Sequence, residues 1–95
     1  MSESAAENIE EQLKQHLGES LPDQAVYNIN AAMELSGILE TKGFTFQLKD
    51  MCPKSIIDTN WRATFLKDDR KFSAENAQSA LAVCMAAVEA LRALT

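Results

Sequence analysis

The stretch that decides the fold reads Phe44-Thr45-Phe46-Gln47-Leu48-Lys49, and it alternates strictly between apolar and polar residues. Successive side chains of a β-strand point to opposite faces of its sheet, so this alternation predicts a strand with one buried face. A second alternating stretch lies at residues 61–66, where Trp61, Ala63 and Phe65 occupy every other position. Residues 50–60 connect the two strands. After a turn at residues 67–70, Lys71-Phe72 predicts a third, very short strand.

Apolar residues at helical spacing predict three helices around these strands. The first covers residues 5–17, and the second begins near Asn28, a good N-cap residue, and ends at Gly43. The last is predicted to begin at a Ser73 cap and to run to about residue 94. It has no charged residue from 79 to 88, and a helix that is apolar nearly all round is buried nearly all round. We therefore expect it to lie between the sheet and another helix, either the N-terminal one or one from a second copy.

The predicted order is helix, helix, strand, strand, a third strand that the pattern leaves open, and helix. This order indicates an α+β fold, in which a small antiparallel sheet of two or three strands is packed between helices. Ninety-five residues suit one domain. We expect residues 21–95 to form this α/β sandwich domain and residues 1–20 to be an acidic helical arm appended to it.

The net charge of −5 is concentrated near the N-terminus. Residues 1–24 hold six acidic side chains against the single base Lys14, and the rest of the chain is neutral. Nucleic-acid backbones are bound by clustered lysines and arginines, so nucleic acid is not an expected partner. An acidic edge suits a basic protein surface, unless its charge only solvates the helix. The predicted partner-binding residues are Glu3, Glu7, Glu10 and Glu11.

No arrangement of residues in the sequence predicts catalysis, a cofactor or a metal site. His16 is the single histidine, and with Cys52 and Cys84 it makes three soft ligands where a zinc site wants about four. The glycines stand singly and form no phosphate-binding loop. The sequence also lacks an apolar run of about 18 residues and an N-terminal signal pattern, so we expect a non-enzymatic, cytoplasmic protein with no membrane contact.

The connection at residues 50–60 and the strands after it mix charged and apolar side chains. Ile56, Ile57 and Trp61 either cover this domain's own sheet or form part of an interface. The charged candidates for binding a partner or a ligand are Lys54, Asp58, Arg62, Arg70 and Lys71.

Residues 27–94 are similar to the phage ABA sandwich domain family. The resemblance lies in the helix at 28–35, the Gly43-Phe44 entry to a strand, the Trp61-x-Ala63-x-Phe65 strand, and the alanine-rich segment at 80–87 with Cys84. It implies a small phage or prophage protein. The expected function is to bind and inhibit a host protein, such as an antiviral CRISPR effector. One alternative is an oligomeric sponge that traps a nucleotide immune signal, with Lys54, Arg62, Arg70 or Lys71 meeting phosphates at subunit junctions. Another is a structural phage protein. A homodimer or larger assembly is expected.

The predicted order also resembles that of double-stranded-RNA-binding domains. Those domains place lysines at the start of the closing helix to contact phosphates. Here that helix is predicted to begin Ser73-Ala74-Glu75-Asn76, so the basic cluster is missing and RNA binding is the less favoured reading.

Overall fold

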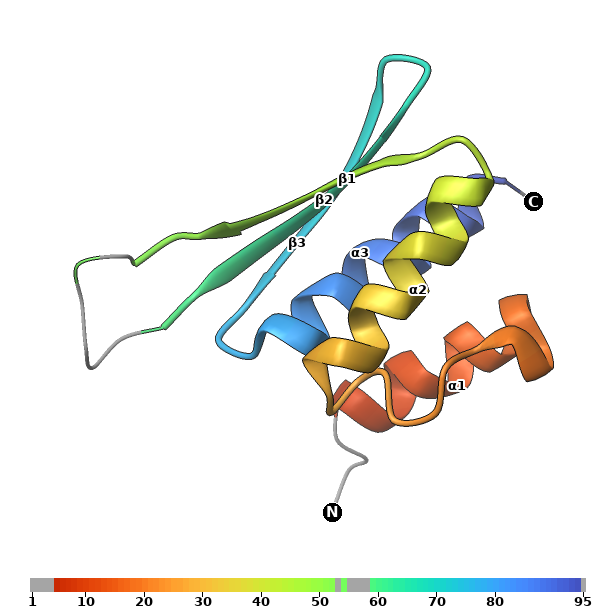
Figure 1. The fold of residues 1–95 in the computed structure, drawn as a ribbon, viewed down its shortest axis with the longest axis horizontal. Helices are drawn as coiled ribbons and strands as arrows, with labels where there is room; N and C mark the ends of the chain where they lie inside the picture. Colours follow the sequence, from red (N-terminus) through yellow and green to blue (C-terminus); the bar gives the residue numbers. More distant parts are fainter. Residues whose placement is uncertain (1–4, 53, 55–58, 95) are drawn as a thin grey trace.

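The computed structural model describes residues 5–52, 54 and 59–94, and Figure 1 shows how its helices and strands are arranged. The small α+β class and the order α-α-β-β-β-α are confirmed. None of the described helices combines the length and the apolar character that crossing a bilayer requires. The elements are α1 (Ala5–Leu17), the 3-10 turn η1 (Gly18–Ser20), α2 (Ile29–Thr41), β1 (Thr45–Asp50), β2 (Trp61–Lys67), β3 (Arg70–Asn76) and α3 (Ser79–Arg92).

The strands form one antiparallel sheet in the order β1-β2-β3. Its register places Phe46 opposite Phe65, and Phe65 opposite Phe72, so a row of aromatic rings crosses the inner face. The rings of Phe46 and Phe65 lie 4.9 Å apart, and Phe44 meets Phe65 and Phe72 edge to face at 6.1 Å each. The alternation in the sequence thus produces the predicted buried face.

All three helices lie on that one face of the sheet (Figure 1), which differs from the expected sheet between helices. α3 packs on β2 and β3, α2 lies along α3, and α1 packs on α3 as well. The opposite face of the sheet carries mostly polar side chains. The alternating strands supply only one apolar face, so a helical layer on the other face would have to bury polar groups. The outward side chains include those of Gln47, Lys49, Arg62, Thr64, Ser73 and Glu75.

α3 is the most deeply buried element. Ten of its 14 residues are buried, and many are alanines, which let the neighbouring elements approach closely. Leu13 of α1 is fully buried in the same apolar cluster, against α3. The prediction that this helix lies between the sheet and another helix is confirmed, and the N-terminal helix is the one that covers it.

The predicted boundary between β3 and the last helix is wrong. β3 is not limited to residues 71–72 but pairs with β2 along its full length, from Arg70 opposite Lys67 to Asn76 opposite Trp61. Ser73 caps no helix, and its hydroxyl lies 3.2 Å from that of Thr64 on β2. The helix begins at Ser79, and the side chain of its N-cap residue makes no capping hydrogen bond. Pairing with the preceding strand, β2, therefore overrides the local preference of serine for a helix start.

α2 begins and ends close to the two residues that the sequence predicted as its boundaries, Asn28 and Gly43. The Asn28 side chain accepts hydrogen bonds from the backbone amides of Asn30 at 2.8 Å and Ala31 at 3.4 Å. Beyond the last turn, Gly43 adopts a φ of +97°, which residues with a Cβ rarely adopt. The turn delivers Phe44 directly to the core at the entrance to β1.

We predict that Ala86→Asp greatly lowers the melting temperature, whereas the matched variant Ala77→Asp does not. Ala86 is fully buried in α3, where an unpaired carboxylate costs several kcal/mol. Ala77 is exposed just before α3, where an acidic group is favoured by about 0.3–1 kcal/mol. Thermal unfolding followed by circular dichroism checks this, and equal melting temperatures for the two variants would contradict the buried position of α3.

Candidate functional site

Of the predicted acidic residues, Glu7 and Glu11 are exposed on the outer side of α1. Glu10 is half-buried at the margin of the inner side, close enough to Cys84 of α3 to contribute to the raised pKa of that thiol, and Leu13 on the inner side is buried in the apolar core cluster. Glu3 lies outside the described residues. The buried contact of Leu13 fixes which side of α1 faces outward, so the carboxylates project from a helix that is held in place.

The structure adds two carboxylates that the sequence patterns did not single out. α1 and the segment after it enclose a hollow of 350 Å³, which we call the acidic groove. Its three carboxylates come from Glu10 of α1 and from Glu19 and Asp23 of the segment. The apolar lining comes from half-buried Leu21 and Pro22. The full lining is Glu10, Lys14, Gly18, Glu19, Leu21, Pro22, Asp23 and Gln24.

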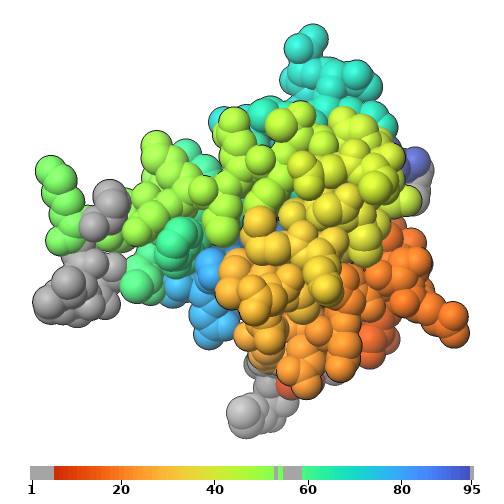
Figure 2. Space-filling model, viewed as in Figure 1, coloured from red at the N-terminus to blue at the C-terminus, as the bar shows by residue number. Residues whose placement is uncertain are grey.

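Local backbone geometry and burial hold this segment in place. Gly18 turns the chain out of α1 with a φ of +56°, and Gln24 adopts a φ of +60° at the next bend. Ala25 and Val26 are then buried in the core and anchor the segment before α2. In Figure 2 this part of the chain, coloured orange, lies on the surface next to α2. The acidic excess of residues 1–24 was the signal in the sequence, but only the fold brings Glu10, Glu19 and Asp23 around one hollow.

The face of the sheet opposite the helices, which we call the open face, carries an ion pair between Arg62 and Glu75. The Nε and Nη2 atoms of Arg62 donate to Oε2 of Glu75 at 3.0 and 2.7 Å, and Asn60 donates to Oε1 at 2.8 Å. These hydrogen bonds, with that from Arg62 first, hold the pKa of Glu75 below its ordinary value of 4.5. The positive charge of Arg62 is thus largely balanced within the chain.

The other predicted ligand residues do not gather around one point. Arg70 lies over the Phe72 ring at 5.3 Å, at the end of the sheet formed by the β2–β3 turn. Lys71 is exposed on β3, and Lys54 is exposed in the β1–β2 connection at the other end of the sheet. Asp58, with Ile56 and Ile57, lies outside the described residues. Half-buried Trp61 packs against the core cluster.

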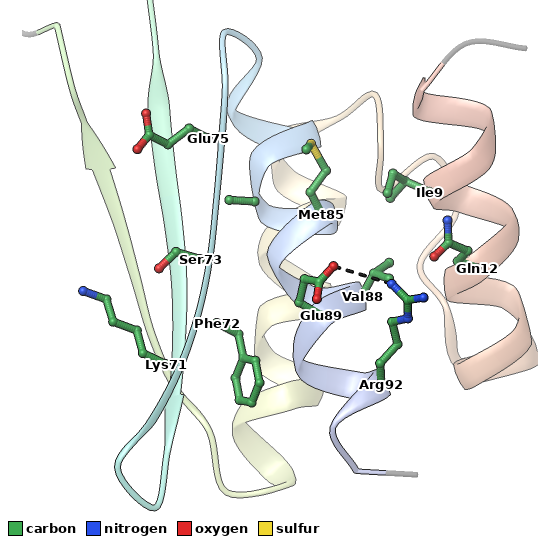
Figure 3. Close-up of a pocket in the computed structure, with 11 residues that line it drawn as sticks. Ile9, Gln12, Lys71, Phe72, Ser73, Glu75, Met85, Val88, Glu89 and Arg92 are labelled. Atoms are coloured by element: carbon green, nitrogen blue, oxygen red, sulfur yellow. Dashed lines mark ion pairs between the residues drawn. The ribbon is translucent and has the colours of Figure 1, made fainter. Parts of the chain in front are cut away.

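A larger hollow lies between the free edge of β3 and α1, and we call it the edge groove. It has a volume of 520 Å³. Figure 3 shows the side chains that line it. α3 forms its floor, where Glu89 and Arg92 approach to 3.6 Å. The short third strand predicted from sequence gave no indication of this groove. Its lining is Ile9, Gln12, Lys71, Phe72, Ser73, Ala74, Glu75, Met85, Val88, Glu89 and Arg92.

The thiol of Cys84 is poorly placed for chemistry. Cys84 is buried in α3, and burial raises the pKa of its thiol to about 12, so the reactive thiolate is scarce at neutral pH. Among the residues that the structure describes, no three histidine, cysteine or acidic side chains are grouped so that they could hold a metal ion.

We predict that Arg62→Gln raises the pKa of Glu75 toward its ordinary value, because the strongest hydrogen bond to the carboxylate is lost. A lowered pKa means that the pair stabilises the fold at pH values above 4.5 and that this contribution is lost as the pH falls through the lowered pKa. A carbon-detected NMR titration measures the shift. The control variant Lys42→Gln, at an exposed site after α2, should leave the Glu75 titration unchanged, and an unchanged titration in Arg62→Gln would refute the pairing.

Comparison with known proteins supplies no family for the chain: no family model, no curated protein and no solved structure matches it. The resemblance to the phage ABA sandwich domain therefore rests on the residues quoted for it above. Function has to be argued from the surfaces of this molecule.

Proposed function

We propose that this protein is a non-enzymatic binding protein that docks its acidic surface on a basic face of a host protein and inhibits it. The observation that carries the proposal is the acidic groove. Glu10, Glu19 and Asp23 surround a concave surface with an apolar lining, beside the exposed Glu7 and Glu11 of α1. Concave shape, apolar lining and charge of one sign are the features that recognise a protruding basic segment.

The energetics of the free protein favour such a partner. Carboxylates held close together on a fixed surface repel one another, and among the described residues Lys14 is the one base that lines the acidic groove. A basic partner converts that repulsion into attraction and accelerates encounter, because opposite potentials steer association. Leu21 and Pro22 supply apolar contact once the partner is seated.

The class of target follows from the same chemistry. Proteins that bind nucleic acids carry clustered lysines and arginines, so an acidic surface competes well for those sites. An antiviral effector that binds nucleic acid fits this description and agrees with the resemblance to phage proteins. The proposed setting is the cytoplasm of the host cell.

The nucleotide-sponge alternative gains no support from the geometry of a single chain. Within one chain, Arg62 is engaged by Glu75 and Arg70 lies at the opposite end of β2, so these cations do not converge on one phosphate group. Nor does the closing helix offer the basic start that RNA-binding domains use, since the chain has no lysine or arginine between Lys71 and Arg92.

We predict that the triple variant Glu10→Gln, Glu19→Gln, Asp23→Asn loses the partner. The matched control changes Glu34→Gln, Glu40→Gln and Asp69→Asn, which removes the same charge from exposed residues that do not line the acidic groove. Each form is immobilised and exposed to bacterial lysate, and captured proteins are quantified by mass spectrometry. A basic protein should be retained by the natural chain and by the control but not by the triple variant.

Association kinetics with the purified partner then separate electrostatic steering from nonspecific binding. The natural chain and the control should show an association rate that falls steeply with salt, because screening weakens the attraction between the two surfaces. Equal capture by all three forms, or an association rate in the triple variant that matches the natural chain at every salt concentration, would contradict the proposal.

A further inference from the structure

The free edge of β3 presents its backbone to the edge groove. Five consecutive residues of the strand, from Lys71 to Glu75, line this hollow. Consecutive residues point to opposite faces of a sheet, so a strand that lines a hollow with all of them turns its edge toward it. β2 occupies the other side of β3. The outward N–H and C=O groups of an edge strand are ready to pair with another strand.

The sequence of β3 is complementary in charge to itself. In an antiparallel pair of two β3 strands centred on Ser73, all seven residues from Arg70 to Asn76 find partners. Lys71 of each copy then lies directly opposite Glu75 of the other. We propose that a second copy of this chain docks in the edge groove by pairing β3 with β3 in this register, which forms a continuous six-stranded sheet with two-fold symmetry.

The groove lining fits a second copy on both faces of the sheet. On the helical face the same register places Phe72 opposite Ala74 of the other copy, a large side chain against a small one. Met85 and Val88 on the floor of the groove extend this apolar surface toward α3 of the second copy. On the open face, each Glu75 lies between Arg62 of its own chain and Lys71 of the second. Cross-strand pairs of this kind are the unit by which sheets are stabilised.

The other free edge lacks this complementarity. β1 reads Thr45-Phe46-Gln47-Leu48-Lys49-Asp50. When it is aligned antiparallel on itself about Gln47 or about Leu48, Lys49 meets Thr45 or Gln47 of the other copy and finds no opposite charge. The two edges therefore differ in a way that selects β3. A symmetric pair also closes on itself, so it ends at the dimer and does not extend into a filament.

A charge exchange between copies tests the register. Lys71→Glu places two acidic groups opposite each other in its own dimer, and Glu75→Lys places two basic groups opposite each other, so each variant alone should dimerise about tenfold or more weakly. When the two are mixed, both cross-strand pairs become opposite in charge again. Analytical ultracentrifugation should show a dimer of the natural chain, monomers of each variant and a restored dimer in the mixture. Circular dichroism verifies that both variants are folded.

A cross-link gives an independent measurement at the symmetry axis. Residues directly opposite in antiparallel strands lie about 4.5–5.5 Å apart at Cα, within the range of a disulfide. In a Cys52→Ser background, Ser73→Cys should form a covalent dimer on mild oxidation, while Gln47→Cys at the centre of β1 should remain monomeric. A natural chain that stays monomeric at all concentrations, a mixture that fails to restore the dimer, or equal cross-linking at both edges would each overturn the proposal. An extended peptide from another protein could occupy the groove only if the chain itself is monomeric.

Discussion

The burial of α3 is the constraint on which the rest of the structure depends. A helix without a charged residue from Ser79 to Val88 has to be covered on several sides, because exposed apolar surface costs about 25 cal/mol per Å². No single neighbour can cover it. The sheet takes one side, α2 lies along another and α1 closes a third through Leu13. The small side chains of α3 let the sheet, α2 and α1 approach it closely, but they add little apolar volume to the core.

This arrangement also decides where the surfaces for binding lie. Because every helix packs toward α3, all three lie on one face of the sheet (Figure 1). The side chains on the other face are mostly polar. Because Leu13 turns inward, Glu7 and Glu11 must turn outward. The acidic groove and the edge groove lie on opposite flanks of α1, with Glu10 facing one and Ile9 and Gln12 facing the other. The proposed partner and the proposed second copy would therefore dock on separate surfaces of the chain.

Local patterns in the sequence predicted the elements whose signals are local. Alternation placed β1 and β2, the Asn28 cap placed the start of α2, and the uncharged stretch in α3 predicted its burial. What depends on contacts between one element and the next was not predicted. Ser73 has the chemistry of a helix cap, but β2 offers it a strand partner, so β3 is seven residues long and the helix starts later. The same holds for the sites: Glu19 and Asp23 meet Glu10 only after the chain has turned at Gly18.

The measurement that tests this account most directly is native-state hydrogen exchange of the backbone amides, followed by NMR. If α3 is the element around which the others assemble, its amides from Leu81 to Leu91 open only in global unfolding and exchange most slowly of all. Amides of the edge strand β1 and of the outer side of α1 should exchange faster. Exchange in α3 that is as fast as in β1, at the rate of local opening, would contradict the central place given to α3.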